Sequence, residues 1–411
     1  MATSKPLKDS FENCYDDFSN EAAVHILNAT KDGVSERFQK RLDEFTHVKV
    51  DSLSKFKEKD VFYDRSIYTG SAGIAMYYFM LGMKQNSMNP ESLKTALHYL
   101  SLDKLRKVRI SFLCGDAGPL ALASVISYKL GARRPAFLLE YTTLVDRLIS
   151  LTELLKQSPD EILYGKSGYL YALLFVNKYL EAKDAIPPEV FKKVISSILI
   201  SGKQFSTQMK SESPLLWQWH DKIYFGAAHG MAGILYMLLQ AHVHVDSDEM
   251  QTLIKPSIDW LLSRRFQSGN FSSSMSSSNG DKLVQWCHGA PGFVPLCIAA
   301  AKYFEDDKYM KIAEECCDVI WERGLCTKGY SLCHGVAGNA YSFIQMYQAT
   351  KNPLHLYRGC CFKDWCAEER PGTELHPPDR PASLFEGLTG QLYLAADITN
   401  ISNAQFPGFS L

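Results

Sequence analysis

The chain has 411 residues, of which 46% are apolar and 12% aromatic, enough to bury a large core. Its 44 Lys and Arg residues balance 45 Asp and Glu residues, so net charge gives no reason to expect nucleic acid or an anionic lipid surface as a partner. The eleven cysteines show no C-x-x-C spacing, a pattern that favours free thiols in a reducing cytoplasm over a disulfide framework.

No targeting signal is expected at the start of the chain, because Met1 to Pro6 contains no apolar region and Ala2 stands where myristoylation needs glycine. No apolar run approaches the ~20 residues of a membrane-spanning helix, and Ile74 to Leu81 is typical of the longest. The sequence therefore predicts a cytoplasmic protein without a transmembrane segment, with peripheral membrane association as an alternative.

A pair of glycines three positions apart recurs seven times, at intervals of 45 to 65 residues. With 26 glycines in 411 residues, chance would give roughly two such pairs, so the chain is predicted to consist of seven repeats. The pairs begin at Gly70, Gly115, Gly165, Gly230, Gly289, Gly335 and Gly387.

An apolar stretch follows each glycine pair, and it is apolar on nearly every face, as buried helices are. These stretches are Ile74–Leu81, Pro119–Ile126, Tyr169–Val176, Ile234–Leu239, Phe293–Ala301, Ala340–Ile344 and Gln391–Ala396. Segments with polar and apolar residues at helical spacing lie between them and predict amphipathic outer helices. Those segments are Ser35–Phe56, Pro90–Leu105, Phe137–Leu155, Pro188–Phe205, Glu249–Phe266, Asp307–Arg323 and Asn352–Cys366.

This alternation predicts an all-α fold, a seven-fold α/α barrel or toroid of two concentric helix rings, spanning residues 1–411 as a single domain. All seven glycine loops would then lie at one end of the barrel, around one cavity. An open helical solenoid is the alternative, but it would leave the apolar inner helices without a partner surface.

Two stretches interrupt the repeat. The serine-rich segment Gln267–Lys282 is predicted to be a mobile polar loop. The segment Glu374–Pro381 cannot be helical because of its prolines, and it is predicted to be a lid over the cavity mouth. Its Pro378-Asp-Arg-Pro381 also matches the minimal P-x-x-P pattern of ligands for SH3 domains.

Two copies of one phrase carry the candidate chemistry: Trp286-Cys287-His288-Gly289 and Leu332-Cys333-His334-Gly335. Each places a thiol and an imidazole on a glycine loop, where the backbone can bend to bring the side chains together. Sulfur and nitrogen ligands that converge in this way suit a tetrahedral zinc ion. We interpret the pair as the active site.

These phrases, together with Gly226-Ala-Ala-His229-Gly230 and Ser383-Leu-Phe-Glu386-Gly387, resemble those of the eukaryotic LanC-like proteins, relatives of the bacterial lanthionine cyclases. The resemblance extends over nearly the whole chain. It implies one zinc ion, glutathione as co-substrate, and transfer of the glutathione thiolate to electrophiles. The acceptors it implies are small molecules or proteins that contain dehydroalanine or dehydrobutyrine.

By motif, Cys287, Cys333 and His334 match the zinc ligands of this family and leave a fourth position open. Three protein ligands with one vacancy are typical of catalytic zinc, whereas a structural zinc, the alternative, is closed by four. Structural sites also tend to use C-x-x-C pairs, which this chain lacks. His288 is expected to pack beside a ligand rather than to bind the metal.

The resemblance also implies a glutathione pocket. Lys328 matches a glutathione-contacting lysine, although a solvated surface lysine is the alternative. His376, Pro377, Pro378 and Asp379 align with the C-terminal glutathione segment of the family. The sequence departs from the expected pattern at His376, where an arginine is expected, and a weaker cation there would weaken binding.

Addition of a thiolate to an unsaturated residue leaves a carbanion or enolate that must be protonated. His229 is the candidate general acid, and a histidine hydrogen-bonded within its loop is the alternative. Asp116 and Glu386 are alternative candidates for this role, but carboxylates beside loop glycines also cap helices, and we interpret both as caps. No aspartate falls at the loop position of the acidic partner that the bacterial cyclases use.

Two other functions are compatible with the sequence. One is a glutathione-binding adaptor or sensor that engages SH3 domains or enzymes through its proline-rich segment. The other is a different zinc-bearing helical toroid, such as a prenyltransferase-like subunit. That class adds a carboxylate ligand to cysteine and histidine, and no motif supplies one beside these loops.

Overall fold

The computed structural model describes residues 9–411 apart from 84–87, 182–184, 279, 368–374 and 376. Within these residues the regular structure is helical, and extended segments pair only through isolated β-bridges. Contacts divide the chain into two compact units. Unit 1 comprises Met1–Val61, Arg265–Ser273 and Ser277–Phe406, and unit 2 comprises Phe62–Arg264, Ser274–Ser276 and Pro407–Leu411. The single domain expected over residues 1–411 stays a prediction.

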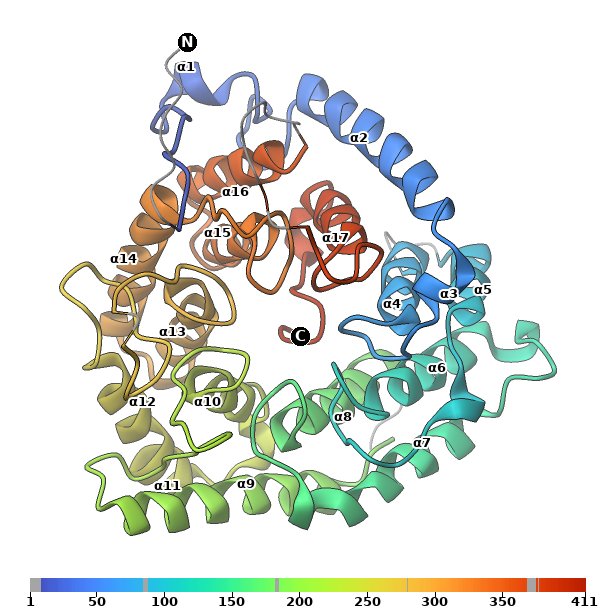
Figure 1. Ribbon diagram of the computed structural model, residues 1–411, viewed down its shortest axis with the longest axis vertical. Helices are drawn as coiled ribbons and strands as arrows, with labels where there is room; N and C mark the ends of the chain where they lie inside the picture. The colour runs from blue at the N-terminus through green and yellow to red at the C-terminus, as the bar shows by residue number, and fades with distance from the viewer. Residues whose placement is uncertain (1–8, 84–87, 182–184, 279, 368–374, 376) are drawn as a thin grey trace. The chain divides into compact units, whose positions relative to one another are not determined.

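Unit 2 consists of buried helices, each backed by a helix with an exposed face (Figure 1). The buried helices are α4 (Ser71–Gly82), α6 (Ala117–Leu130), α8 (Lys166–Leu180) and α10 (Met231–Gln240). The outer helices are α5 (Pro90–His98), α7 (Tyr141–Ser150), α9 (Pro188–Met209), α11 (Ser247–Glu249) and α12 (Lys255–Leu262). Short 3₁₀ turns cover Leu102–Lys104, Gly131–Arg133, Leu151–Gln157 and His242–His244, and a π turn at Met250–Ile254 joins α11 to α12.

Unit 1 repeats the same pairing. Its buried helices are α13 (Ala290–Phe304), α15 (Val336–Thr350) and α17 (Leu388–Ile398). Helix α14 (Asp307–Arg323) packs on α13, and α16 (Pro353–Trp365) packs on α15. Helix α2 (Glu36–Ser54), near the start of the chain, packs on α17 near its end, as Figure 1 shows. The short elements are α1 (Asn20–Ala23), α3 (Glu58–Val61) and a 3₁₀ turn at Ile401–Asn403.

All seven apolar stretches are buried helices, as the sequence predicts. Among the outer helices, α14 spans the expected residues because Asp306 caps its first turn and Gly324 follows its last. The segments Pro90–Leu105 and Phe137–Leu155 are less regular than expected, since each changes to a 3₁₀ turn after its α-helix. No helix in the described ranges is both long and apolar enough to cross a membrane.

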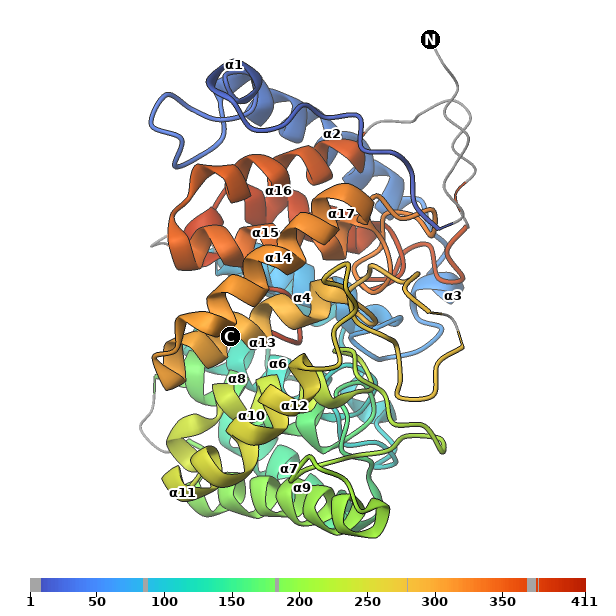
Figure 2. The ribbon, with the colours of Figure 1, turned by 90° about the vertical axis from the view of Figure 1, so that its left-hand side faces the viewer.

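Helix α16 is not amphipathic, contrary to the expectation. Polar side chains such as His355 and Lys363 are fully buried in it. Helix α2 covers Lys363 with the Phe45 ring, and the segment before α1 contacts α14 and α16, as the ribbon views show (Figures 1 and 2). The Tyr357 hydroxyl donates to the carbonyl of Asp16 at 2.9 Å, and the Trp321 indole donates to Asp17 at 3.0 Å.

The glycine pairs are explained by close approach of two backbone segments. At Gly118, Gly168, Gly233, Gly338 and Gly390, a Cβ on the second glycine of the pair would meet the carbonyl oxygen six residues earlier, and at Gly338 the carbonyl oxygen of Leu332 would lie 1.9 Å away. Gly233 meets Ala227 in the same way, also at 1.9 Å. Each inner helix therefore begins flat against its preceding loop, and this brings the loop residues to the start of the helix.

Candidate active site

Backbone hydrogen bonds connect the loops that precede α13, α15 and α17. The amide of Cys287 donates to the carbonyl of Cys333 at 3.1 Å, and the amide of Cys333 donates to the carbonyl of Phe385 at 3.0 Å. All three loops belong to unit 1. The two copies of the Cys-His-Gly phrase, separated by more than forty residues, are therefore adjacent in space.

The predicted zinc ligands meet at this junction. The Cys333 thiol contacts the thiol of Cys287 and the imidazole of His334, and both thiols are buried. The Cys287 thiol and burial raise the pKa of Cys333 well above its ordinary value, while His334 opposes this shift. The side-chain amide of Gln285 donates to the Cys287 sulfur at 3.1 Å.

The chemistry of this donor set fits zinc, because two sulfurs and one imidazole nitrogen are ligands that this ion prefers. The Gln285 amide directed at one sulfur also suits a thiolate better than a thiol. Within the described ranges, however, no group of three His, Cys, Asp or Glu side chains is arranged as a complete metal site. Cys333 thus contacts both of the other proposed ligands.

His288 lies in a tight turn. Its amide donates to the carbonyl of Gln285 at 3.0 Å, and its own carbonyl accepts from the Gln285 amide at 3.1 Å. This turn directs the chain from the Cys287 loop into Gly289, whose φ of +105° only glycine adopts easily. The expectation that His288 is not a metal ligand stays a prediction.

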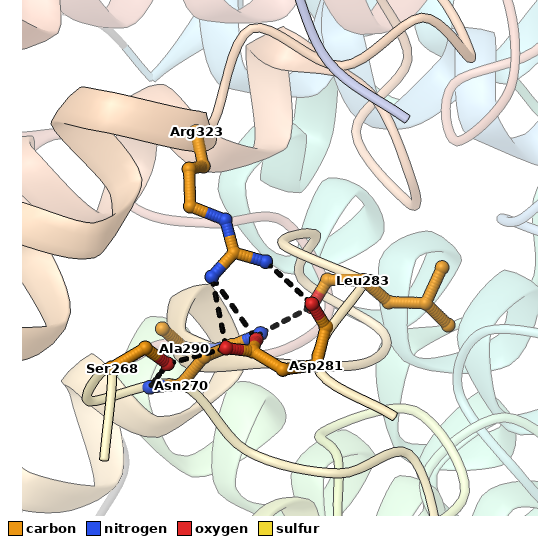
Figure 3. Close-up of polar contacts among 6 residues, drawn as sticks. All are labelled: Ser268, Asn270, Asp281, Leu283, Ala290 and Arg323. Atoms are coloured by element: carbon orange, nitrogen blue, oxygen red, sulfur yellow. Dashed lines mark hydrogen bonds and ion pairs between the residues drawn. The ribbon is translucent and has the colours of Figure 1, made fainter. Parts of the chain in front are cut away.

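A partly buried polar cluster supports the Cys287 loop (Figure 3). The Asn270 side chain accepts from the amide of Ala290, the first residue of α13, at 2.8 Å and donates to Asp281 at 2.8 Å. Arg323, at the end of α14, donates to both carboxylate oxygens of Asp281 at 3.0 and 3.1 Å. Ser268 donates to the same carboxylate at 2.6 Å.

This cluster anchors both ends of the segment expected to be a mobile loop, Gln267–Lys282. Burial raises the pKa of Asp281, but the hydrogen bonds from Ser268 and Asn270 and the charge of Arg323 outweigh it, so the pKa lies below its ordinary value. Asp281 is therefore ionised at neutral pH and ties the loop to α14. Mobility of the tip of the segment stays a prediction.

A cavity of about 470 Å³ in unit 1 adjoins the candidate zinc site. His334 lines it, so one predicted metal ligand faces both the thiol cluster and the cavity. The candidate glutathione contacts Lys328, Pro377, Pro378 and Asp379 also line the cavity. His376 lies outside the described residues.

Two carboxylates have positions other than the expected caps. Glu386 lines the cavity, and the N-cap of α17 is Gly387 rather than Glu386. Asp116 occupies the N-cap position of α6, but its side chain makes no cap hydrogen bond. Its carboxylate instead accepts from the amide of Lys107 at 2.6 Å. The cap interpretation is therefore wrong for both.

The candidate acid, His229, lies in unit 2 and pairs with a residue that the sequence analysis missed. Its Nδ1 lies 2.8 Å from an oxygen of Glu161, a side chain that is only 2% exposed. The carboxylate of Glu161 also accepts from the amides of Leu163 at 2.9 Å and Tyr164 at 2.6 Å. These bonds fix the carboxylate and orient the imidazole, which keeps 23% of its side-chain surface exposed.

The sequence gives little signal for this pair, because 68 residues separate the partners. The acidic partner of His229 is a glutamate rather than an aspartate, and it lies four residues before Gly165. A neighbouring ion pair steadies the same turn, since Lys166 contacts Asp160 at 2.8 Å and Ser201 donates to that carboxylate at 2.8 Å.

Comparison with known proteins identifies the family. Residues 61–411 match the family model described as lanthionine synthetase C-like protein. The chain is 41% identical over 353 residues to "Glutathione S-transferase LANCL1" of Danio rerio, a match that covers 84% of each protein. It is 29% identical over 367 residues to "LanC-like protein GCL1" of Arabidopsis thaliana, covering 85% of this chain and 82% of that one.

Among solved structures, "Nisin cyclase" matches with a TM-score of 0.62 at 16% identity, over 91% of this chain and 99% of the other. A likeness at this level of identity shows the fold, and it confirms the predicted all-α, α/α-barrel class. The family model, the glycine repeats and the paired Cys-His-Gly loops all indicate the same family. The chain therefore belongs to the lanthionine synthetase C-like protein family.

Proposed function

We propose that this protein is a zinc-dependent glutathione transferase that adds the glutathione thiolate to electrophiles, including dehydroalanine and dehydrobutyrine residues in proteins. The 41% identical relative that is named a glutathione S-transferase supports the reaction class. The observation that carries the proposal is the position of His334, which contacts the buried Cys333 thiol and lines the adjoining cavity.

Cys287, Cys333 and His334 would hold the zinc ion. When bound, zinc supplies a thiolate at neutral pH by lowering the pKa of a coordinated thiol. The ordinary thiol is only a few per cent ionised at pH 7, so full ionisation is worth roughly 2 kcal/mol. Orientation of the thiol beside its acceptor must therefore contribute more, and it can be worth about 7–11 kcal/mol.

The cavity offers the charges that glutathione requires. Its volume of about 470 Å³ lies within the usual range of small-ligand pockets. The Lys328 ammonium can pair with a carboxylate of the tripeptide, and the carboxylates of Asp379 and Glu386 can pair with its amine. His334 lines the same cavity, so the cysteine sulfur of glutathione bound there would have one proposed metal ligand in the cavity wall.

His229 supplies the proton in the proposed reaction. A bond forms between the glutathione sulfur and the β-carbon of the acceptor, and the electron pair of the carbon–carbon double bond moves toward the carbonyl. The α-carbon then takes a proton from Nε2 of His229. Glu161 accepts from Nδ1–H of the imidazolium, so its carboxylate stabilises the charged, proton-donating form.

Substitution of one thiol tests the proposal. We expect Cys333→Ala to lose both bound zinc and glutathione transfer, measured by metal analysis and by glutathione consumption with a dehydroalanine acceptor. Cys297→Ala is the matched control, because this buried thiol in α13 is not a proposed ligand and its removal should spare both zinc and activity. Full transfer by zinc-free protein would reject the mechanism.

The adaptor or sensor function is the second candidate. Pro378, Asp379 and Pro381 are exposed, as a segment recognised by an SH3 domain must be. Pro378 and Asp379 also line the cavity, so glutathione and an SH3 domain would compete for them. Stoichiometric glutathione binding without turnover, together with binding of SH3 domains that excess glutathione weakens, would favour this function over the transferase.

A further inference from the structure

A strongly basic loop lies beside the His229 site in unit 2. It is defined by Lys104, Arg106, Lys107 and Arg109, and within this stretch of six residues there is no carboxylate. All four side chains belong to exposed residues, and none of them forms an ion pair with a carboxylate within the part of the chain that the structure describes. Since the whole chain carries a net charge of only −1, this is a local concentration of positive charge.

The basic loop has a defined conformation. Lys107 has a φ of +52°, which is unfavourable for a residue other than glycine. The Asp116 carboxylate stabilises this bend by accepting from the Lys107 amide at 2.6 Å, and the Asp116 amide donates to the carbonyl of Arg109 at 2.9 Å. Arg147 donates to the carbonyl of Leu102, just before the loop, at 3.2 Å. The cations are therefore held in place on the surface.

The last cation of the basic loop reaches the candidate acid through one aromatic ring. The Arg109 guanidinium lies 4.7 Å from the ring centroid of Tyr164. The Tyr164 ring is nearly parallel to the His229 imidazole, at 10° and 6.1 Å between centroids. Trp219 is also roughly parallel to both, at 5.9 Å from Tyr164 and 6.4 Å from His229. Two roughly parallel rings, Tyr164 and Trp219, thus flank the imidazole, and the guanidinium lies on the Tyr164 ring.

Trp219 is presented by a strained turn. His220 and Asp221 have φ values of +47° and +57°, and the flanking residues Trp219 and Lys222 exchange two backbone hydrogen bonds at 2.8 and 3.1 Å. A two-residue turn of this kind normally contains glycine or asparagine. Left-handed backbone at two consecutive side-chain-bearing residues is found where function requires a fixed geometry.

We propose that Tyr164, Trp219 and the basic loop select the acceptor of the reaction, and that this acceptor is an acidic peptide segment containing the unsaturated residue. The inference rests on the proposed function. A conjugated carbon–carbon double bond and carbonyl form a planar group that can lie against aromatic faces. Carboxylate or phosphate groups on flanking residues would pair with the basic loop. Both contacts are made beside the imidazole that supplies the proton.

Two dehydroalanine peptides test the proposal, one flanked by Asp and Glu and the other by Asn and Gln. Formation of the glutathione adduct by the zinc-loaded protein is followed by mass spectrometry. We expect kcat/KM to be about tenfold higher for the acidic peptide at low ionic strength, and the preference to fall as salt is added.

Variants separate the contribution of the basic loop from that of the aromatic rings. Arg106→Gln with Lys107→Gln should reduce the preference for the acidic peptide about fivefold to tenfold through KM. Lys192→Gln with Lys193→Gln, two exposed cations on α9, is the matched control and should leave the preference unchanged. Trp219→Leu should lower kcat/KM for both peptides alike, because stacking does not depend on flanking charge.

The outcomes distinguish this inference from the proposed function. If zinc-loaded, glutathione-binding protein converts neither peptide, the transferase proposal fails. If it converts both peptides equally well, or the double variant at the basic loop loses both equally, the acceptor proposal alone is overturned. Binding to vesicles of anionic lipid that the double variant abolishes, without any peptide preference, would assign the basic loop to a membrane surface and also overturn it.

Discussion

A buried lysine in α16 allows a direct test of how the burial of a charge affects the stability of this protein. Lys363 in α16 is fully buried, and its ammonium has no hydrogen-bond partner in the described part of the chain. The ammonium lies 3.5 Å from the ring centroid of Phe45 in α2, a contact that compensates only part of the lost hydration. Burial lowers the pKa of Lys363 from 10.5 to about 8, a difference that corresponds to about 3 kcal/mol.

The sign of the effect follows from proton binding. Between pH 8 and 10.5 the unfolded chain holds a proton that folded Lys363 has released, so this group makes the folded state more stable as pH rises. Below pH 8 both states are protonated and the full cost of burying the charge applies. Lys363→Met removes the charge at nearly constant volume. We expect it to raise the free energy of unfolding by about 3 kcal/mol at pH 7, and we expect this gain to disappear by pH 10.5.

The measurement is urea unfolding of wild type and variant at several pH values between 7 and 10.5. The difference between the two proteins is the informative quantity, because buried thiols whose pKa values are raised without a contribution from Lys363, such as Cys297 and Cys316, change the stability of both proteins equally. Lys40→Met, at an exposed position of α2, should show no such difference. A gain for Lys363→Met that is absent at pH 7 or independent of pH would refute the reasoning.

Four further substitutions have defined outcomes. Gly338→Ala places a Cβ 1.9 Å from a carbonyl oxygen and should lower the free energy of unfolding, measured in urea, by about 3 kcal/mol or more. In Gly359→Ala, inside α16, the new Cβ meets its nearest atom at 3.5 Å. This control should be neutral or should raise the free energy of unfolding by about 0.5–1 kcal/mol. Glu161→Gln should lower kcat about tenfold to a hundredfold with glutathione affinity unchanged, because an amide does not stabilise the imidazolium; an unaltered kcat would remove Glu161 from the mechanism. Asp281→Asn should lower the free energy of unfolding by about 1 kcal/mol at pH 7. Because the pKa of Asp281 is lowered, this loss should shrink as pH falls below 3.8. A loss that persists in acid would contradict the ionic role.

The fold could be predicted from the sequence to the extent that it depends on local signals. The glycine pairs mark where each inner helix begins. The stretches after them are apolar on nearly every face, so their burial could be predicted. Helix α16 shows where local signals end. Two of its residues, Tyr357 and Lys363, contact Asp16 and Phe45, which lie more than three hundred residues earlier in the chain, and no local pattern predicts these contacts.

The candidate site also has one part that the sequence predicts and one part that it does not. Cys287, Cys333 and His334 could be grouped because two loops share one phrase, and the structure brings their side chains into contact. The Glu161–His229 pair has no shared phrase and depends on the meeting of two different loops. A carboxylate before a glycine helix start is equally compatible with a cap, a loop clamp or a cavity wall, and only the three-dimensional arrangement separates these roles.

The backbone bonds that join the Cys287, Cys333 and Phe385 loops have a consequence for redesign. Amide and carbonyl groups are present in every residue, so these connections do not depend on which side chain occupies the Cys287 position. Exchange of that thiol for an imidazole or a carboxylate should therefore leave the loops in register while changing the hardness of the donor set. Under the proposed zinc-binding function, the junction would be a frame in which selectivity among metal ions can be altered by replacing single side chains.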